Sequence, residues 1–95
     1  MRNYEIMFIV KTTITEDEVK AVAKKFQDVL TNDGAKITEF VEMGQRELAY
    51  EINKLKTGFY FVINCEASDK AVKEFDRLAL IDSNIIRHLI INKEK

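Results

Sequence analysis

Lysine and arginine side chains are the residues of this sequence whose type and spacing most readily support a chemical function. Two of them, Lys54 and Lys56, lie in the stretch Asn53–Thr57, between an alternating polar and apolar segment and an apolar run that opens at Gly58. A loop of this length with Asn, Lys and a closing Gly is typical of a β-hairpin that presents a binding surface. Because clustered basic side chains bind phosphate, we expect an anion-binding surface near this loop.

Catalytic and metal-binding chemistry is not indicated by the other residue types. The three glycines each suit a turn or bulge, so the sequence lacks a Gly-rich phosphate loop. His88 is the sole histidine, without the Cys or His neighbours of a metal site, and is expected to be a structural strand residue. The single cysteine, Cys65, is in phase with Phe61 and Ile63, which predicts a buried, inert thiol. We therefore expect no catalytic residue, no cofactor and no metal.

The composition predicts one folded domain over residues 1–95. Apolar residues make up 46% and charged residues 33% of the chain, the balance of a globular protein. The longest apolar runs, Ile6–Val10 and Phe59–Ile63, are too short to cross a membrane, and no signal peptide is recognisable, so we expect a cytoplasmic protein. The net charge of −1 disfavours a general nucleic-acid binder, so any RNA contact must come from a local basic cluster.

Two segments carry the signals of amphipathic helices. Thr15 followed by Glu18 is a capping box, apolar side chains recur after it at helical spacing, and Gly34 is a natural left-handed stop. Ser68 is expected to cap a second helix with its own apolar stripe. Both segments predict a helix that turns one face toward a core.

Four segments alternate between polar and apolar residues as β-strands do. They are residues 4–10, 37–52, 59–67 and 85–92, although the last of them is β-branched and apolar on both faces apart from Arg87 and His88. In the second segment the apolar residues occupy odd positions up to Met43 and even positions from Leu48. A strand with one buried face can change phase only by absorbing an extra residue, so we predict a β-bulge or kink near Gly44 to Arg46.

The order strand, helix, strand, strand, helix, strand predicts an α+β protein with the ferredoxin-like β-α-β-β-α-β sandwich. Its four-stranded antiparallel sheet has the strand order four, one, three, two, with both helices on one face. We expect the first and third strands to run one way and the second and fourth the other. The loop at 53–57 and both chain termini would then share one edge of the sheet. The basic residues that would converge there, with Arg46 nearby, are Arg2, Lys54, Lys56, Lys93 and Lys95.

The sheet face away from the helices is more apolar than an isolated domain would need. The residues expected to be exposed on it are Met7, Ile9, Val62, Leu89 and Ile91. A patch of this kind indicates a protein partner or a dimer. A small oligomerising or ligand-sensing ferredoxin-like module therefore stays open as an alternative function.

A second alternative is an RNA-recognition motif, which has the same topology. The run from Gly58 to Val62 partly resembles the aromatic signature of that family's third strand. Phe59 and Phe61 share the phase of the core residues, which leaves Tyr60 as the one outward ring. The base-stacking platform is incomplete, so single-strand RNA binding of this type is the weaker hypothesis.

Several motifs occur in a fixed order along the chain. They are Met1-Arg2-Asn3-Tyr4-Glu5, Gly44-x-Arg46-x-Leu48-Ala49-Tyr50-Glu51-Ile52-Asn53, Gly58-Phe59-Tyr60, Glu74-Phe75-Asp76-Arg77-Leu78 and Ile85-Ile86-Arg87-His88. With them, the chain resembles the bacterial small-subunit (30S) ribosomal protein six family along its whole length. One departure is that Gln45 and Glu47 flank Arg46, where the family often has basic residues, which thins the expected basic cluster.

The resemblance implies a non-enzymatic component of the small ribosomal subunit that binds 16S rRNA in its central domain beside ribosomal protein eighteen. It implies a cytoplasmic, ribosome-associated protein with neither a membrane partner nor a small-molecule substrate. The positions expected to contact RNA are Arg2, Arg46, Lys54, Lys56, Arg87 and Lys93. The positions expected to contact the protein partner are Tyr4, Met7, Ile9, Tyr60, Val62, Leu89 and Ile91. Tyr50 is a further position expected near RNA or partner.

Overall fold

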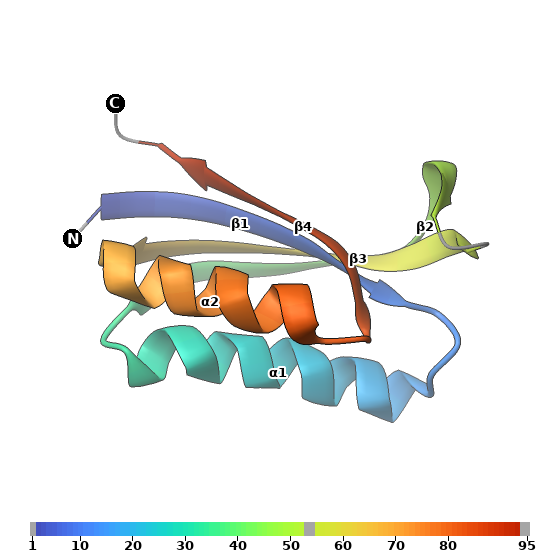
Figure 1. Ribbon diagram of the computed structural model, residues 1–95, viewed down its shortest axis with the longest axis horizontal. Helices are drawn as coiled ribbons and strands as arrows, with labels where there is room; N and C mark the ends of the chain where they lie inside the picture. The colour runs from blue at the N-terminus through green and yellow to red at the C-terminus, as the bar shows by residue number, and fades with distance from the viewer. Residues whose placement is uncertain (1, 53–54, 94–95) are drawn as a thin grey trace.

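The structure, a computed structural model, describes residues 2–52 and 55–93, with the backbone alone at 49–52 and 55. A four-stranded antiparallel sheet carries both helices on one face and leaves the other face open (Figure 1). The predicted element order and ferredoxin-like sandwich are confirmed. The elements are β1 (Arg2–Lys11), α1 (Glu16–Asn32), β2 (Lys36–Ile52), β3 (Leu55–Ala67), α2 (Asp69–Ile81) and β4 (Ile85–Asn92).

Each helix is capped by the residue that the sequence predicted. Thr15 Oγ1 accepts a hydrogen bond from the Glu18 amide at 3.2 Å, and Ser68 Oγ accepts one from the Ala71 amide, also at 3.2 Å. Each bond satisfies an amide that the first turn of a helix leaves without an intrahelical acceptor. Gly34 follows α1 with a φ of 86°, the left-handed conformation that commonly ends a helix.

The core lies between the helices and the inner face of the sheet, where the even-numbered residues of β1 from 4 to 10 are buried. Phe8 is its centre, with ring centroids 5.9 Å from Phe26, 5.2 Å from Phe61 and 6.1 Å from Phe75. Cys65 is 2% exposed, and burial raises the pKa of its thiol. The predicted buried thiol is confirmed, since a raised pKa disfavours the reactive thiolate.

The strand order β2-β3-β1-β4 is confirmed, but the predicted strand directions are wrong. β3 is antiparallel to both β1 and β2, and β4 is antiparallel to β1. β1 and β2 therefore run together, and β3 and β4 run the opposite way. The physical reason is that each helix is a crossover, and a crossover returns the chain parallel to the strand it left. Arg2 pairs with Ala67 at one end of the sheet, and Lys11 pairs with Gly58 at the other.

The predicted phase change in β2 is confirmed and arises from extra residues at two places. The register with β3 shifts between Glu42 and Gly44, slightly before the predicted position, and Gly44 has a φ of 82°. An earlier shift between Ile37 and Glu39 turns Phe40 toward the core, where it packs against the buried cluster. Without that first shift the odd-numbered residues would have stayed on the inner face, as the alternation alone predicted.

β2 and β3 continue beyond the end of β1 as a projecting hairpin arm (Figure 1). Within the described residues their pairing extends from Glu47 and Thr57 out to Ile52 and Leu55. At the base of the arm, Thr57 Oγ1 lies 3.1 Å from Thr12 Oγ1 at the end of β1. This contact ties the arm to the body of the sheet.

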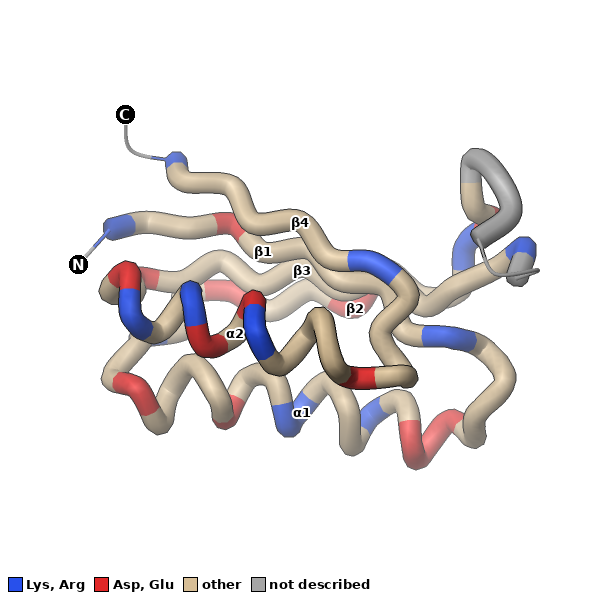
Figure 2. Tube along the Cα trace, viewed as in Figure 1, with Lys and Arg blue, Asp and Glu red and all other residues tan. Residues whose placement is uncertain are grey.

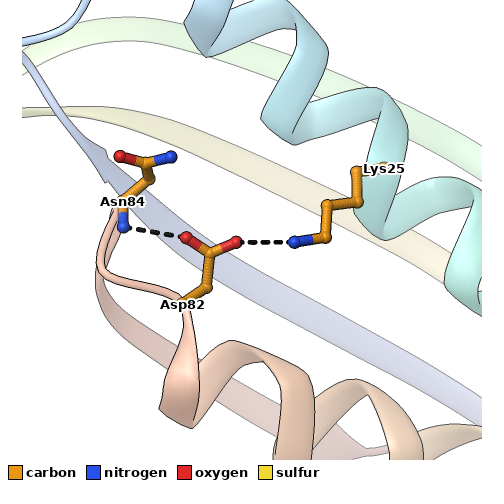
Figure 3. A network of polar contacts seen from close by, with 3 residues as sticks. All are labelled: Lys25, Asp82 and Asn84. Carbon is orange, nitrogen blue, oxygen red and sulfur yellow. Dashed lines mark hydrogen bonds and ion pairs between the residues drawn. The ribbon is translucent and has the colours of Figure 1, made fainter.

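A network of polar contacts around Asp82 connects α1 to the turn between α2 and β4 (Figure 3). Asp82, after α2, accepts a hydrogen bond from the Asn84 amide at 2.8 Å through Oδ1 and one from Lys25 Nζ on α1 at 3.1 Å through Oδ2. The carbonyl of Asn84 in turn accepts a bond from the Lys11 amide at 2.9 Å. One mostly buried carboxylate therefore joins α1 and the α2–β4 turn, and through Asn84 the end of β1.

Candidate nucleic-acid and protein interface

The basic residues of the strands divide between the two ends of the sheet (Figure 2). The terminal end has Arg2 at the start of β1, Lys36 at the start of β2 and Lys93 directly after β4. The hairpin end has a larger group from all four strands. Its members are Lys11, Arg46, Lys56 and Arg87, called here the hairpin-end basic face. The expected meeting of both termini with the hairpin loop is therefore wrong, because the opposed direction of β1 and β3 separates them by the length of the sheet.

Cross-strand register places the hairpin-end basic face on the open side of the sheet. Arg46 and Lys11 both lie opposite Gly58 on β3, on either side of it, and Arg87 lies opposite Ile9. Lys56 precedes Gly58 by two residues and so shares its face. Lys54 belongs to the same segment but lies outside the described residues.

The two residues that flank Arg46 do not lie on this surface. Gln45 pairs with Phe59, which packs against the core, so Gln45 and Glu47 point to the helix side of β2 while Arg46 points to the open side. The thinning of the basic cluster that the sequence suggested is therefore not present on the open face. Arg46 Nε donates a hydrogen bond to the carbonyl of Met43 at 3.2 Å, which steadies its exposed side chain.

Arg2 and Lys93, at the terminal end, interact with other residues of the chain. Asp69 Oδ1 accepts a hydrogen bond from the Tyr4 hydroxyl at 2.7 Å. That bond and the nearby charge of Arg2 hold the pKa of Asp69 below its usual value, and the same bond raises the pKa of Tyr4. Lys93 Nζ donates to Asn64 Oδ1 at 2.6 Å. Arg2 and Lys93 thus meet intramolecular partners that a phosphate would have to replace.

An apolar row crosses the open face next to the basic residues. It runs through one residue of each strand, in the order Val41, Val62, Met7 and Leu89. Val41 is 37% and Leu89 is 46% exposed, and Ile91 beside the row is 43% exposed. The open face thus exposes large aliphatic side chains from strands on both edges of the sheet.

Two of the residues expected to contact a partner offer almost no surface. Tyr4 is 7% exposed, because its ring belongs to the core and its hydroxyl is bonded to Asp69. Ile9 is 3% exposed, although it lies on the open face. Gly58 explains the burial, because a Cβ added there would lie only 2.3 Å from Ile9 Cγ2, so the backbone of β3 packs directly on this side chain. Val41 and Lys11 are surface members that the sequence did not single out.

His88 has a structural position, and the open face lacks the aromatic platform of an RNA-recognition motif. His88 Nε2 lies 2.7 Å from Asp76 Oδ1 and its ring lies beside Phe75, which makes it a link between β4 and α2. Phe61 is buried in the core, so the three-ring platform of an RNA-recognition motif is not formed on the open face. Among residues 2–52 and 55–93, no cluster of His, Cys, Asp and Glu is placed to hold a metal ion.

Comparison with known proteins decides the family. The family model described as Ribosomal protein S6 matches residues 3–92, nearly the entire chain. The chain belongs to the ribosomal protein S6 family. A crystal structure of 30S ribosomal protein S6 from Thermotoga maritima is similar to it with a TM-score of 0.93 and 28% sequence identity, over 97% of this chain and 87% of that one.

Membership of the S6 family confirms the resemblance that the ordered motifs indicated. The S6 family is one of ribosomal proteins of the small subunit, not of enzymes. In the part of the chain that the structure describes, no helix is long and apolar enough to span a membrane. In this chain the open face of the sheet carries a basic surface and an apolar surface side by side.

Proposed function

We propose that this chain is a structural constituent of the small ribosomal subunit that binds the central domain of 16S rRNA together with ribosomal protein eighteen. It acts in the cytoplasm, bound to the ribosome, in subunit assembly and translation. The observation that carries the proposal is the hairpin-end basic face, where four cations from four strands share the open side of the sheet. The proposal needs no catalytic residue, cofactor or small-molecule substrate.

The rRNA contact is assigned to this end because of its local charge. The whole chain has a net charge of −1, so most of its surface gives phosphate no attraction. At the hairpin end the neighbouring strands bring Lys11, Arg46 and Arg87 within a few strand spacings of about 5 Å each. Such a concentrated patch attracts and orients a polyanion even on a weakly acidic protein. Arg46 can present two donors to one phosphate, which lysine cannot.

The contact with ribosomal protein eighteen is assigned to the apolar row and its neighbours Tyr60 and Ile91. Burying exposed aliphatic side chains stabilises a complex by roughly 25 cal/mol for each Å² of apolar surface removed from water. Tyr60 pairs with Ile9 between the apolar row and the basic face, so a partner on the row would sit against bound RNA. Adjacent sites of this kind favour joint binding of RNA and partner.

A titration tests the proposal. The chain is titrated against a central-domain 16S rRNA fragment at several salt concentrations, with and without ribosomal protein eighteen. About four phosphate contacts give a slope of log affinity against log salt near −3, and the partner should tighten binding. Lys73→Ala, on the helix side, is the matched control and should leave the slope unchanged.

A slope near zero, or no effect of the partner, would contradict the proposal. A symmetric dimer of the free chain that persists at low concentration, with no RNA binding, would favour the oligomerising module, since the apolar row could also pair two copies. Loss of single-strand RNA binding in Tyr60→Ala alone would favour the RNA-recognition-motif hypothesis, because one stacked ring contributes about 1–3 kcal/mol.

A further inference from the structure

The second bulge of β2 controls which charges reach the open face. Glu42 lies opposite Phe61 and Gly44 lies opposite Tyr60, which leaves Met43 as an extra residue. Before this point Phe40 and Glu42 face the helices; after it the residues that face the helices are Gln45 and Glu47. The bulge therefore reverses the phase of the strand just before its arginine.

The bulge decides the face on which Arg46 and Glu47 lie. Side chains alternate between the two faces of a strand, so with no extra residue Arg46 would follow Glu42 to the helix side. Glu47 would then point to the open face, among Lys11, Lys56 and Arg87. With the bulge, the arginine joins the cations and the carboxylate leaves them. The all-cationic character of this surface is thus a result of one additional residue in β2.

The bulge also holds the arginine side chain. The hydrogen bond from Arg46 Nε ends on the carbonyl of Met43, the extra residue itself. A bond through Nε occupies one edge of the guanidinium. The edge formed by the two terminal nitrogens is the one suited to a bidentate contact with phosphate. The same backbone irregularity thus selects the face of Arg46 and steadies its side chain.

Gly44 is the residue that this geometry requires. Its φ of 82° is in the left-handed region that side-chain-bearing residues rarely adopt, yet an added Cβ would meet nothing within 4 Å. Space is therefore available, and the requirement concerns the backbone conformation alone. Resting on the function proposed above, we propose that Gly44 is a positioning residue for rRNA binding, which acts through the Met43 bulge by directing Arg46 to the hairpin-end basic face.

A second glycine provides a matched control. Gly34, at the end of α1, has a φ of 86° and likewise nothing within 4 Å of an added Cβ. Gly34→Ala and Gly44→Ala should therefore lower the melting temperature by similar amounts. Only Gly44→Ala should weaken binding to the central-domain rRNA fragment, by about tenfold, the size of one charge-assisted contact. Its salt slope should fall by about 0.7–0.9, the contribution of one phosphate.

Double variants test the mechanism. Arg46→Ala should weaken rRNA binding about as much as Gly44→Ala, and the variant with both changes should be no weaker than either alone, because both lose the same contact. Gly34→Ala should leave the effect of Arg46→Ala unchanged. If Gly44→Ala keeps the wild-type slope and affinity, or if its effect multiplies with that of Arg46→Ala, the positioning role is wrong.

A readout without RNA separates this proposal from the proposed function. In the free protein, exchange of the Arg46 Nε–H with water, measured by NMR, should be slowed by its hydrogen bond to the Met43 carbonyl. Gly44→Ala should make this exchange faster, and the control Gly34→Ala should leave it unchanged. If Arg46→Ala does not alter rRNA affinity, the assigned RNA surface is wrong, whereas the exchange of Nε–H still decides whether Gly44 positions the arginine. Unchanged slow exchange in Gly44→Ala would overturn the inference whatever the RNA result.

Discussion

Both ends of the sheet carry lysine and arginine side chains, but the surroundings of these side chains differ. At the terminal end, Arg2 lies near the carboxylate of Asp69 and Lys93 donates to Asn64, so both cations already have polar partners. At the hairpin end, the register collects cations from all four strands on one side and turns Glu47 to the other. The comparison teaches that a count of basic residues does not locate an RNA surface. What matters is where the fold gathers the cations and which side of the sheet it gives to the neighbouring carboxylates.

Reversing one charge at each end of the sheet should give the largest difference in rRNA affinity between the two ends. Arg87→Glu at the hairpin end should weaken binding to the central-domain rRNA fragment about 10–100-fold at 0.1 M salt, because it removes one attraction and adds a repulsion. Lys93→Glu, a matched reversal at the terminal end, should change the affinity less than about threefold. Equal losses from the two variants would show that both ends contact RNA.

A substitution in the apolar row is expected to weaken binding of the protein partner with little change in RNA binding. Leu89→Asp should reduce affinity for ribosomal protein eighteen more than tenfold by placing a carboxylate in the contact, while RNA binding by the chain alone changes little. Leu80→Asp is the control, since Leu80 is a 71% exposed leucine on α2, on the helix side of the molecule. Isothermal titration calorimetry measures both. A weaker complex with the Leu80 variant would move the partner to the helices.

The Asp82 network at the hairpin end should stabilise the fold mainly through the hydrogen bond from the Asn84 amide and less through the ion pair with Lys25. Asp82→Ala should reduce the free energy of unfolding by about 1–2 kcal/mol, because it removes the acceptor of the Asn84 amide from a mostly buried position. Lys25→Ala should cost about 0.5 kcal/mol or less, as expected for an exposed partner. Urea denaturation distinguishes the two, and equal losses would assign the stabilisation to the ion pair instead.

Loss of the Tyr4–Asp69 hydrogen bond at the terminal end should have the smallest effect, a change in folding stability that is seen only at acidic pH. The pKa of Asp69 is lowered in the fold, so its contribution to stability is present above its unfolded pKa of about 4 and is lost as the pH falls through its lower folded pKa. Tyr4→Phe removes the main cause of the shift, so the variant should lose less stability than wild type between pH 6 and pH 2. Tyr60→Phe, a hydroxyl on the open face, serves as the control. Parallel pH profiles for wild type and Tyr4→Phe would contradict the assignment.

Local signals in the sequence predicted the local structure well. The caps at Thr15 and Ser68 and the buried phase of β1 depend on residues a few positions apart, so alternation and spacing were sufficient to find them. The phase change in β2 was also visible, because Gly44 marks it. The earlier shift at Thr38 carries no glycine and left only the anomalous phase of Phe40 as a sign.

Features that depend on distant strands were harder to predict. The error in strand direction moved the hairpin loop to the wrong end, although the two crossovers contained the information needed to avoid it. The burial of Ile9 depends on the close approach of Gly58, forty-nine positions further along the chain by the printed numbering, and alternation cannot report it. The interaction of Arg2 with Asp69 joins residues that are even further apart in the sequence.

The hairpin arm has a consequence for how the protein can change over time. From Arg46 to Ile52 a strand extends about 20 Å, beyond the point where β1 ends. Arg46, at the base of this extension, lies on the open side of the sheet and outside the phenylalanine core, so an exchange of its side chain leaves that core packed. The surface at the base of the arm can therefore change in sequence while the sandwich stays the same.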